Sequence, residues 1–442
     1  MNVPPPLPAP SPDAVVAAEP LTALELLNSY APVFLIAFVV TLVVTPLIRR
    51  VAVSFEIIDK PDQTRKQHSF PIAYLGGLAV FFGVLVGIIL SFSLTSGVAG
   101  DLMHVPLSVV LGLLAITITG LADDTWGLDP RLKVSGQLIA AAALAIQNVG
   151  TRVAEGALAN TIGPANDTLF TVGSFVVQNG DLYYWIGIAL IAIFVLGGCN
   201  AANLIDGLDG LLSGTVAIMM LGFLAVSLMM ATTFTETSAD DSLAGARIVI
   251  CLATLGAVLG FLPWNWNPAV IFLGDTGSLL LGYLSVVVIL MFGEHGHTHL
   301  VLAGLIIFAL PIMDTALAIV RRRLAGVPFS TPDSNHLHHQ VKRATGGVKS
   351  AVLTLYGVSA AFAAVGATVA GLVIYRIVRF QIGYAIAIVL FGFVMAIAFK
   401  AARRQLWDAA AKQADGSGSK SATGTGAAAG EQPARETAGS TR

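Results

Sequence analysis

The chain has 442 residues, of which 55% are hydrophobic and 11% are charged, and its mean hydropathy is +0.80. This composition excludes an ordinary soluble globular protein and indicates a polytopic membrane protein. The formal net charge of -2 provides no basic field for a nucleic-acid partner, and Cys199 and Cys251, in or beside apolar segments, imply no disulfide framework.

The predicted elements begin after a Pro- and Ala-rich leader, residues 1–29, which we expect to be disordered. Residues 30–408 are predicted to form one transmembrane domain, and residues 409–442, rich in Gly, Ser, Thr and Ala, a disordered cytoplasmic tail. The apolar segments of the domain are residues 30–48, 72–94, 105–122, 132–149, 185–198, 211–232, 248–262, 278–292, 300–320, 351–375 and 382–399. The predicted fold class is therefore an all-α polytopic membrane protein with about 11 transmembrane helices.

The basic residues are distributed unevenly among the connections between these segments. Of 24 Lys and Arg residues, 20 follow an odd-numbered segment or lie in the C-terminal tail, whereas 4 follow an even-numbered segment. Under the positive-inside rule the larger group is cytoplasmic, which predicts an external N-terminus and a cytoplasmic C-terminus. On the predicted external side, turn signals around TLFTVGSFVV in residues 151–182 predict a small β-hairpin. The external stretch GEHGHTH, residues 293–299, is interpreted as a solvated loop rather than a metal site.

Groups able to do chemistry occur in five connections on the predicted cytoplasmic side. In chain order they are DKPDQTRKQH (59–68), ADDTWGLDPRLK (122–133), NAANLIDGLDG (200–210), WNWNPAVIFLGDTGS (264–278) and DSNHLHH (333–339). In the third stretch two amides and two carboxylates recur every third residue, which keeps them along one slowly drifting helical face. They are Asn200, Asn203, Asp206 and Asp209. We expect these four groups to enter one small volume; the alternative is a polar connection that happens to be acidic.

The carboxylates on this side would repel one another unless a cation lies among them. They are Asp123, Asp124, Asp206, Asp209 and Asp275. Oxygen ligands with little Cys or His nearby suit Mg²⁺, or Mn²⁺ in its place, better than Zn²⁺. For Asp123 and Asp124 taken alone, a solvated helix end is the alternative.

Basic and imidazole side chains on the same side could bind phosphate groups. They are Arg65, Lys66, His68, Lys133, Arg321, Arg322, Arg323, His336, His338 and His339. Arg makes bidentate contacts with phosphate, and His can donate or relay a proton. The alternatives are membrane-surface anchoring for the three consecutive arginines and a zinc site for HLHH, although carboxylate and phosphate partners are preferred there.

Taken in order, these motifs resemble the polyprenyl-phosphate N-acetylhexosamine-1-phosphate transferase superfamily over the stretch from Asp59 to His339. The matching elements are DKPxxxRKxH followed by Gly76-Gly77, DDxxGL with Lys133, NxxNxxDGLDGL, NPAxxFLGDTGS and HLHH. The resemblance implies transfer of a sugar 1-phosphate from a UDP-sugar to a membrane polyprenyl phosphate, with release of UMP. It also implies a Mg²⁺ cofactor, the cytoplasmic membrane of a bacterium with the active site on its cytoplasmic face, and a homodimer.

The resemblance assigns roles to individual residues. Asp275 is implied as the principal Mg²⁺ ligand, with Asp123 and Asp124 facing the metal and the attacking lipid phosphate, and His338 is implied as a further catalytic group. Implied substrate-binding residues are Asp59, Arg65, Lys66, His68, Lys133, Asn203, Asp206, Asp209, Asn265, Phe272, His336 and His339, of which Asn265 and Phe272 resemble a uracil pocket. Whether Asp123 removes a proton or attacks the diphosphate stays open, and direct single displacement is preferred.

Departures from one branch of this superfamily indicate the expected donor. Where the muramoyl-pentapeptide branch usually has Lys, TPTMGG and PLHHHFE, this chain has Gly127, IAYLGG and HLHHQV. The chain instead resembles the branch that starts O-antigen, teichoic acid, arabinogalactan or capsule chains, usually with UDP-GlcNAc. Transfer of phospho-N-acetylmuramoyl-pentapeptide is the alternative within the superfamily.

A transporter is the alternative from a different functional class. Transporters carry coupling groups near the bilayer midplane on interrupted helices. Asp314, in LPIMDTALAIVRRR, lies inside a predicted span and could serve as a proton site. Because no internal repeat is evident and the other acids lie at one face, we interpret Asp314 as a structural or supporting residue.

Overall fold

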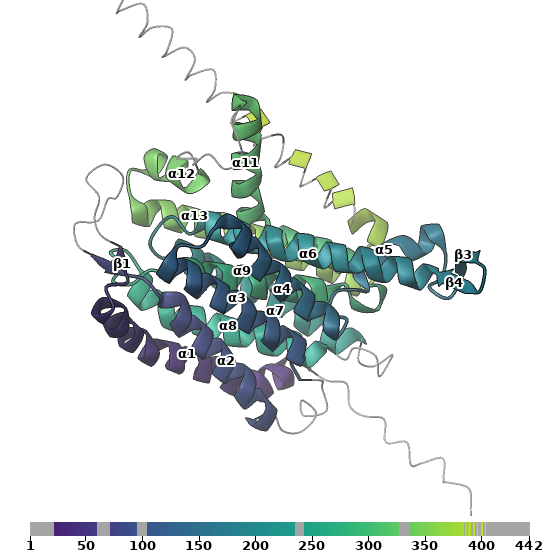
Figure 1. Ribbon diagram of the computed structural model, residues 1–442, viewed down its shortest axis with the longest axis horizontal. Coiled ribbons are helices and arrows are strands. Elements are labelled where there is room, and N and C mark those ends of the chain that lie inside the picture. Colours follow the sequence, from purple (N-terminus) through teal and green to yellow (C-terminus); the bar gives the residue numbers. More distant parts are fainter. Residues whose placement is uncertain are drawn as a thin grey trace, which may run out of the picture.

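The computed structural model describes residues 22–59, 71–94, 104–234, 243–326 and 336–383, together with single residues and short groups between 385 and 403. These residues form a bundle of helices with two small two-stranded sheets (Figure 1). The helices are α1 (Ala23–Ser54), α2 (Gly76–Leu94), α3 (Leu107–Trp126), α4 (Pro130–Ile146), α5 (Val153–Ile162), α6 (Asn179–Ile205), α7 (Leu211–Phe234), α8 (Ala244–Asn265), α9 (Gly274–Phe292), α10 (Thr298–Ile307), α11 (Ala309–Ala325), α12 (Leu337–Thr345) and α13 (Val348–Ile374). The strands are β1 (Ile58–Asp59), β2 (Ile72–Ala73), β3 (Thr168–Val172) and β4 (Phe175–Gln178).

The helices confirm the predicted class of multi-pass helical membrane protein. Within the described residues, 8 helices are long and apolar enough to cross a membrane, or up to 9 if α10 and α11, which meet at an angle of 75°, form one broken span. The predicted fourth span corresponds to α4, which has 17 residues and is not among them. The predicted eleventh span, residues 382–399, is only partly described, so the total of about 11 spans stays a prediction.

Helix α9 lies at the centre of the bundle. Every residue from Thr276 to Phe292 is buried, because this helix is apolar on all sides and packs against α2, α3, α6, α7, α8 and α10. Helix α1 lies on the outside, where Leu35, Val39, Val43 and Leu47, spaced four residues apart, are each more than half exposed and form an apolar stripe suited to lipid.

The first boundary of the predicted domain needs a correction. Helix α1 begins at Ala23, and its cap Thr22 forms a capping box with Glu25, so the last residues of the predicted 1–29 leader are helical. The rest of that leader and the predicted tail, residues 409–442, lie outside the described residues.

Strands β3 and β4 form an antiparallel hairpin inside the stretch where the sequence predicts one. On which side of the membrane this hairpin lies stays a prediction. The GEHGHTH stretch is not the solvated loop that we expected: the buried Glu294 accepts a hydrogen bond of 2.9 Å from the backbone N–H of Gly150, and the ring of His297 stacks on Phe234. The loop is therefore part of the packing at that end of the bundle.

Candidate active site

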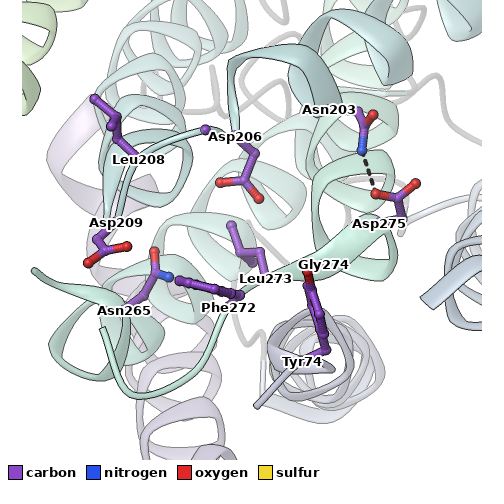
Figure 2. A pocket seen from close by; sticks show the side chains of 11 residues that line it. Tyr74, Asn203, Asp206, Leu208, Asp209, Asn265, Phe272, Leu273, Gly274 and Asp275 are labelled. Atoms are coloured by element: carbon purple, nitrogen blue, oxygen red, sulfur yellow. Dashed lines mark hydrogen bonds between the residues drawn. The ribbon is translucent and has the colours of Figure 1, made fainter. Parts of the chain in front are cut away.

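The motif NAANLIDGLDG forms the end of α6 and the turn into α7. Helix α6 ends at Ile205, and Gly210, at φ +75°, redirects the chain before α7 begins at Leu211. Beside this turn lies a cavity of about 340 Å³ (Figure 2). Its lining residues are Tyr74, Asn203, Asp206, Gly207, Leu208, Asp209, Asn265, Phe272, Leu273, Gly274 and Asp275.

Asn200, the first polar residue of the motif, does not line this cavity. Its Nδ2 donates hydrogen bonds to Oε1 of Gln137 at 2.9 Å and to the carbonyl of Leu196 at 2.7 Å. Because Gln137 belongs to α4, Asn200 connects α6 to α4. The expectation that all four polar groups enter one volume is therefore wrong for Asn200.

The start of α9 forms another part of the cavity wall, and close packing fixes its position. The backbone N–H groups of Gly76 and Gly77 donate to the carbonyls of Phe272 and Leu273 at 2.9 and 2.8 Å. A Cβ atom on Gly77 would collide with the backbone of Gly277. The motif glycines at the start of α2 are therefore required by the close approach of α2 to α9.

Asp124 caps the first turn of α9. Its Oδ1 accepts the backbone N–H of Asp275 at 2.7 Å, and its Oδ2 accepts the backbone N–H and the hydroxyl of Thr276 at 2.9 and 2.6 Å. The first N–H groups of a helix have no partner within the helix, so a carboxylate supplied by another helix satisfies them. Asp124 thus joins the end of α3 to the start of α9.

Asp123, the neighbouring acid, faces a different partner. Nζ of Lys133 lies 3.1 Å from Oδ2 of Asp123 and also forms an ion pair with Oδ2 of Asp275. The second oxygen of Asp123 accepts the backbone N–H of Leu128 at 2.8 Å. Nδ2 of Asn203 donates to Oδ1 of Asp275 at 2.8 Å, the contact drawn in Figure 2. One ammonium group and one amide therefore hold the two carboxylates at the edge of the cavity.

Asp206 lies between this edge and Asp209, and its carboxylate points into the cavity (Figure 2). It makes no hydrogen bond to any residue that the structure describes. Burial, followed by the charges of Asp275, Asp124 and Asp209, raises the pKa of Asp206 from 3.8 to about 8. This carboxyl group is therefore available to a ligand, and a cation bound nearby would favour its ionised form.

Asp209 and Asn265 line the cavity and also hold its wall together. Oδ2 of Asp209 accepts Nδ2 of Asn267 at 2.8 Å and the backbone N–H of Ala269 at 3.0 Å. Asn265 bridges two segments: its Oδ1 accepts from the backbone N–H of Gly210 at 3.1 Å, and its Nδ2 donates to the carbonyl of Ile271 at 3.1 Å. Asp209 and Asn265 are thus held in place by the wall that they line.

Two aromatic rings form the apolar part of the lining. Tyr74 and Phe272 have ring centroids 6.0 Å apart at an interplanar angle of 59°. Phe272 was predicted to line a base pocket, whereas Tyr74 was missed; the available signal was an aromatic residue just before Gly76-Gly77. Asp59 is buried close by, and burial followed by the charge of Asp59 raises the pKa of Tyr74.

The HLHH motif forms the start of α12 and does not line the cavity in the described part of the chain. His336 and His338 are buried and lie against Asp314. The pKa of His339 is lowered to about 4, first by burial and then by the nearby charge of His338. Arg65, Lys66 and His68 lie outside the described residues, so their predicted contacts with phosphate stay predictions.

The donor set fits a magnesium ion. Asp123 and Asp275 lie at or beside the cavity with Lys133 between them, and the carboxyl group of Asp206 points into the same cavity. No three His, Cys, Asp or Glu side chains form a complete metal-binding group within the described residues. Mg²⁺ commonly uses one or two carboxylates and completes its shell with water and substrate phosphate. Asp123 and Asp275, which share Lys133, are the residues that would hold it.

Comparison with known proteins identifies one matching family model and several relatives with similar printed names. A model of a family described as glycosyl transferase family 4 matches residues 106–293. A Bacillus subtilis protein named "Probable undecaprenyl-phosphate N-acetylglucosaminyl 1-phosphate transferase" is 31% identical over 328 residues, which cover 73% of this chain and 80% of the relative. A decaprenyl-phosphate N-acetylglucosaminephosphotransferase of Mycolicibacterium smegmatis is 33% identical over 75% of this chain and 79% of the relative. A phospho-N-acetylmuramoyl-pentapeptide-transferase of Bacillus cytotoxicus is 32% identical over 56% of this chain and 69% of the relative.

Proposed function

Because the chain belongs to glycosyl transferase family 4, we propose that it transfers N-acetylglucosamine 1-phosphate from a UDP-sugar to a membrane polyprenyl phosphate. The products would be a polyprenyl diphosphate sugar and UMP, and the lipid product would initiate a cell-envelope polysaccharide. Relatives that carry N-acetylglucosamine in their names match 73% and 75% of the chain, whereas relatives named as muramoyl-pentapeptide transferases match 56% to 65%. This difference in coverage favours the N-acetylglucosamine donor.

One observation carries the proposal: Lys133 lies between the carboxylates of Asp123 and Asp275 at the edge of a cavity that is both acidic and aromatic. An acidic site with a single interposed ammonium suits phosphate substrates that arrive with a divalent cation. When bound, Mg²⁺ would neutralise charge on the diphosphate and on the leaving UMP.

The chain's own residues would then position the reactants. An oxygen of the lipid phosphate attacks the phosphorus that carries the sugar, and the bond from that phosphorus to the bridging oxygen of the uridine phosphate breaks. Lys133 can orient an incoming phosphate while Asn203 holds the Asp275 carboxylate in place. The lipid phosphate, with a second pKa of about 6, needs little help from a base near neutral pH. In this proposal Asp123 would accept any residual proton, and direct displacement without a covalent intermediate is preferred.

The same proposal specifies the setting of the reaction. The charge distribution supports a bacterial cytoplasmic membrane location with the cavity on the cytoplasmic side, where UDP-sugars are available. The external N-terminus and the homodimer remain part of this proposal.

The direct test assays the purified protein in detergent with one polyprenyl phosphate, Mg²⁺ and two donors side by side. UDP-GlcNAc should give UMP and a labelled lipid product, and UDP-MurNAc-pentapeptide should not. Efficient use of the pentapeptide donor would reverse the choice of donor but keep the reaction type. Absence of UMP formation with every UDP-sugar and lipid tested would refute the proposed transfer.

A further inference from the structure

Asp314 on α11 is a fully buried acid outside the cavity. Its Oδ1 accepts the backbone N–H of Leu337, the first residue of α12, at 2.7 Å. Its Oδ2 lies 3.3 Å from Nδ1 of His336 and 3.6 Å from Nδ1 of His338. The hydrogen bond to Oδ1 offsets part of the cost of burying this carboxylate, whereas Oδ2 has no hydrogen-bond partner among the described residues and faces the two imidazoles. Asp314 therefore joins α11 to the start of α12, and Figure 1 shows these two helices near each other.

The opposite edge of the His338 ring faces the cavity wall. His338 is 2% exposed, and a Cβ atom added to Gly207 would collide with its Nε2. Gly207 itself lines the cavity and lies between Asp206 and Leu208. The ring is thus enclosed between the Asp314 carboxylate and the backbone of the DGLDG turn.

The contact between the two side chains is electrostatic: Nδ1 of His338 and Oδ2 of Asp314 have no hydrogen-bond partner among the described residues and face each other at 3.6 Å. The Asp314 carboxylate lies beside Nδ1 of His338 and would leave Nε2 directed at Gly207. Replacing the carboxylate by an amide would remove the negative charge beside Nδ1 of His338 while changing little of the volume.

We propose that Asp314 is a positioning residue for the transferase, which acts through Nδ1 of His338 to hold this imidazole against the Gly207 turn. The inference rests on the proposed function, because its effect is measured on sugar 1-phosphate transfer. The role differs from a transport site, since the acid is enclosed by protein groups. It also differs from simple attachment of α12 through Leu337 and His336, because, of these contacts, only the His338 ring also lies against the Gly207 turn beside the cavity.

The test compares Asp314→Asn, His338→Ala and the double variant by steady-state kinetics with UDP-GlcNAc and polyprenyl phosphate. We expect Asp314→Asn to lower kcat by ~10²-fold, the scale of a small misplacement of a group at a reacting site. UMP affinity and the thermal unfolding midpoint should change little. Because Asp314 acts through His338, the double variant should have the kcat of His338→Ala alone. Glu294→Gln is the matched control, since it neutralises another buried acid, near Gly150 and away from the cavity, and its kcat should stay within about twofold of wild type.

Losses in kcat that multiply in the double variant would overturn the inference, as would a folded Asp314→Asn protein with normal kcat. If Asp314→Asn does not fold, Asp314→Glu keeps the charge but moves it by one methylene. In a folded Asp314→Glu protein, a loss of kcat that is absent from the His338→Ala background supports the inference, and an unchanged kcat contradicts it. A wild-type protein that forms no UMP would instead count against the proposed function itself.

Discussion

The carboxylate of Asp124 accepts a hydrogen bond of 2.7 Å from the backbone N–H of Asp275. Asp124 thus caps the start of α9 at Asp275, although the two acids are 151 positions apart in the sequence. Asp123 instead shares Lys133 with the side chain of Asp275. The paired acids of the DD motif therefore contact α9 in different ways, and we expect them to contribute differently to activity.

Removal of the cap should destabilise the start of α9. Asp124→Ala removes all three acceptor contacts to Asp275 and Thr276, and loss of a helix cap typically costs about 1 kcal/mol, with a range of about 0.5 to 2. We expect a lower thermal unfolding midpoint together with reduced kcat. Thr276→Val, which removes only the hydroxyl contact, should show a smaller change in both. If Asp124→Ala weakened Mg²⁺ binding without affecting stability, Asp124 would be a direct metal ligand, as the sequence suggested.

Removal of the ammonium group between the two carboxylates should separate turnover from metal affinity. Lys133→Met leaves Asp123 and Asp275 facing each other without a counter-charge, and this arrangement attracts a divalent cation more strongly. We expect kcat to fall by ~10²-fold, on the scale of other electrostatic deletions in active sites, without an increase in the Mg²⁺ concentration needed for half-maximal activity. Lys133→Arg, which keeps the charge, is the control. A large increase in that Mg²⁺ concentration for Lys133→Met would contradict this view of the site.

The carboxyl group of Asp206 should make the metal-free protein sensitive to pH. Its pKa is raised from 3.8 to about 8, chiefly by burial, so the folded protein binds more protons than the unfolded chain between these values. The contribution of Asp206 to the free energy of unfolding in EDTA should therefore be most favourable below pH 4. It should be lost progressively as the pH rises towards 8. The thermal unfolding midpoint of Asp206→Asn, measured over the same pH range, should fall less steeply than that of the wild type. Identical pH profiles for the two proteins would show that Asp206 is not the responsible group.

The aromatic pair should contribute to nucleotide binding. Tyr74→Ala removes one of the two rings that line the cavity, and stacking of a base on an aromatic ring contributes about 1 to 3 kcal/mol. We expect the Kd for UMP to rise by about tenfold, measured by calorimetry in detergent. Tyr74→Phe keeps the ring and removes the hydroxyl, so it should bind UMP nearly as wild type does. Equal losses in the two variants would instead assign the effect to the hydroxyl group near Asp59.

The proposed orientation can be measured in intact cells. In a background of Cys199→Ser and Cys251→Ser, Gln340→Cys on α12 should be shielded from an impermeant thiol reagent, whereas Asn166→Cys before β3 should react. Labelling after membrane disruption shows that both positions are reactive when accessible. The reverse pattern would place the cavity outside the cell and would exclude cytoplasmic UDP-sugars as donors.

The sequence by itself determined the helical membrane class, most of the long apolar helices and the family, but not the shorter helices α5 and α12. These properties depend on local features: runs of apolar residues long enough to span lipid, turn residues, and motifs that are short and ordered along the chain. The 75° bend between α10 and α11 lies inside one predicted apolar segment and was not predicted, because apolar residues continue across the break.

Only the tertiary structure decided what each polar side chain contacts. The regular spacing from Asn200 to Asp209 suggested one common helical face, but α6 ends at Ile205. Asn200 lies on the helix and contacts Gln137 of α4. Asp209 lies beyond the helix and accepts a hydrogen bond from the segment after α8. Adjacent residues on a helix point about 100° apart, so Asp123 and Asp124 meet different groups: Asp124 contacts the backbone at the start of α9, and Asp123 contacts the ammonium of Lys133. Which helix lay in each direction depended on contacts between segments far apart in the chain, and these contacts arise from the packing of the whole bundle around α9.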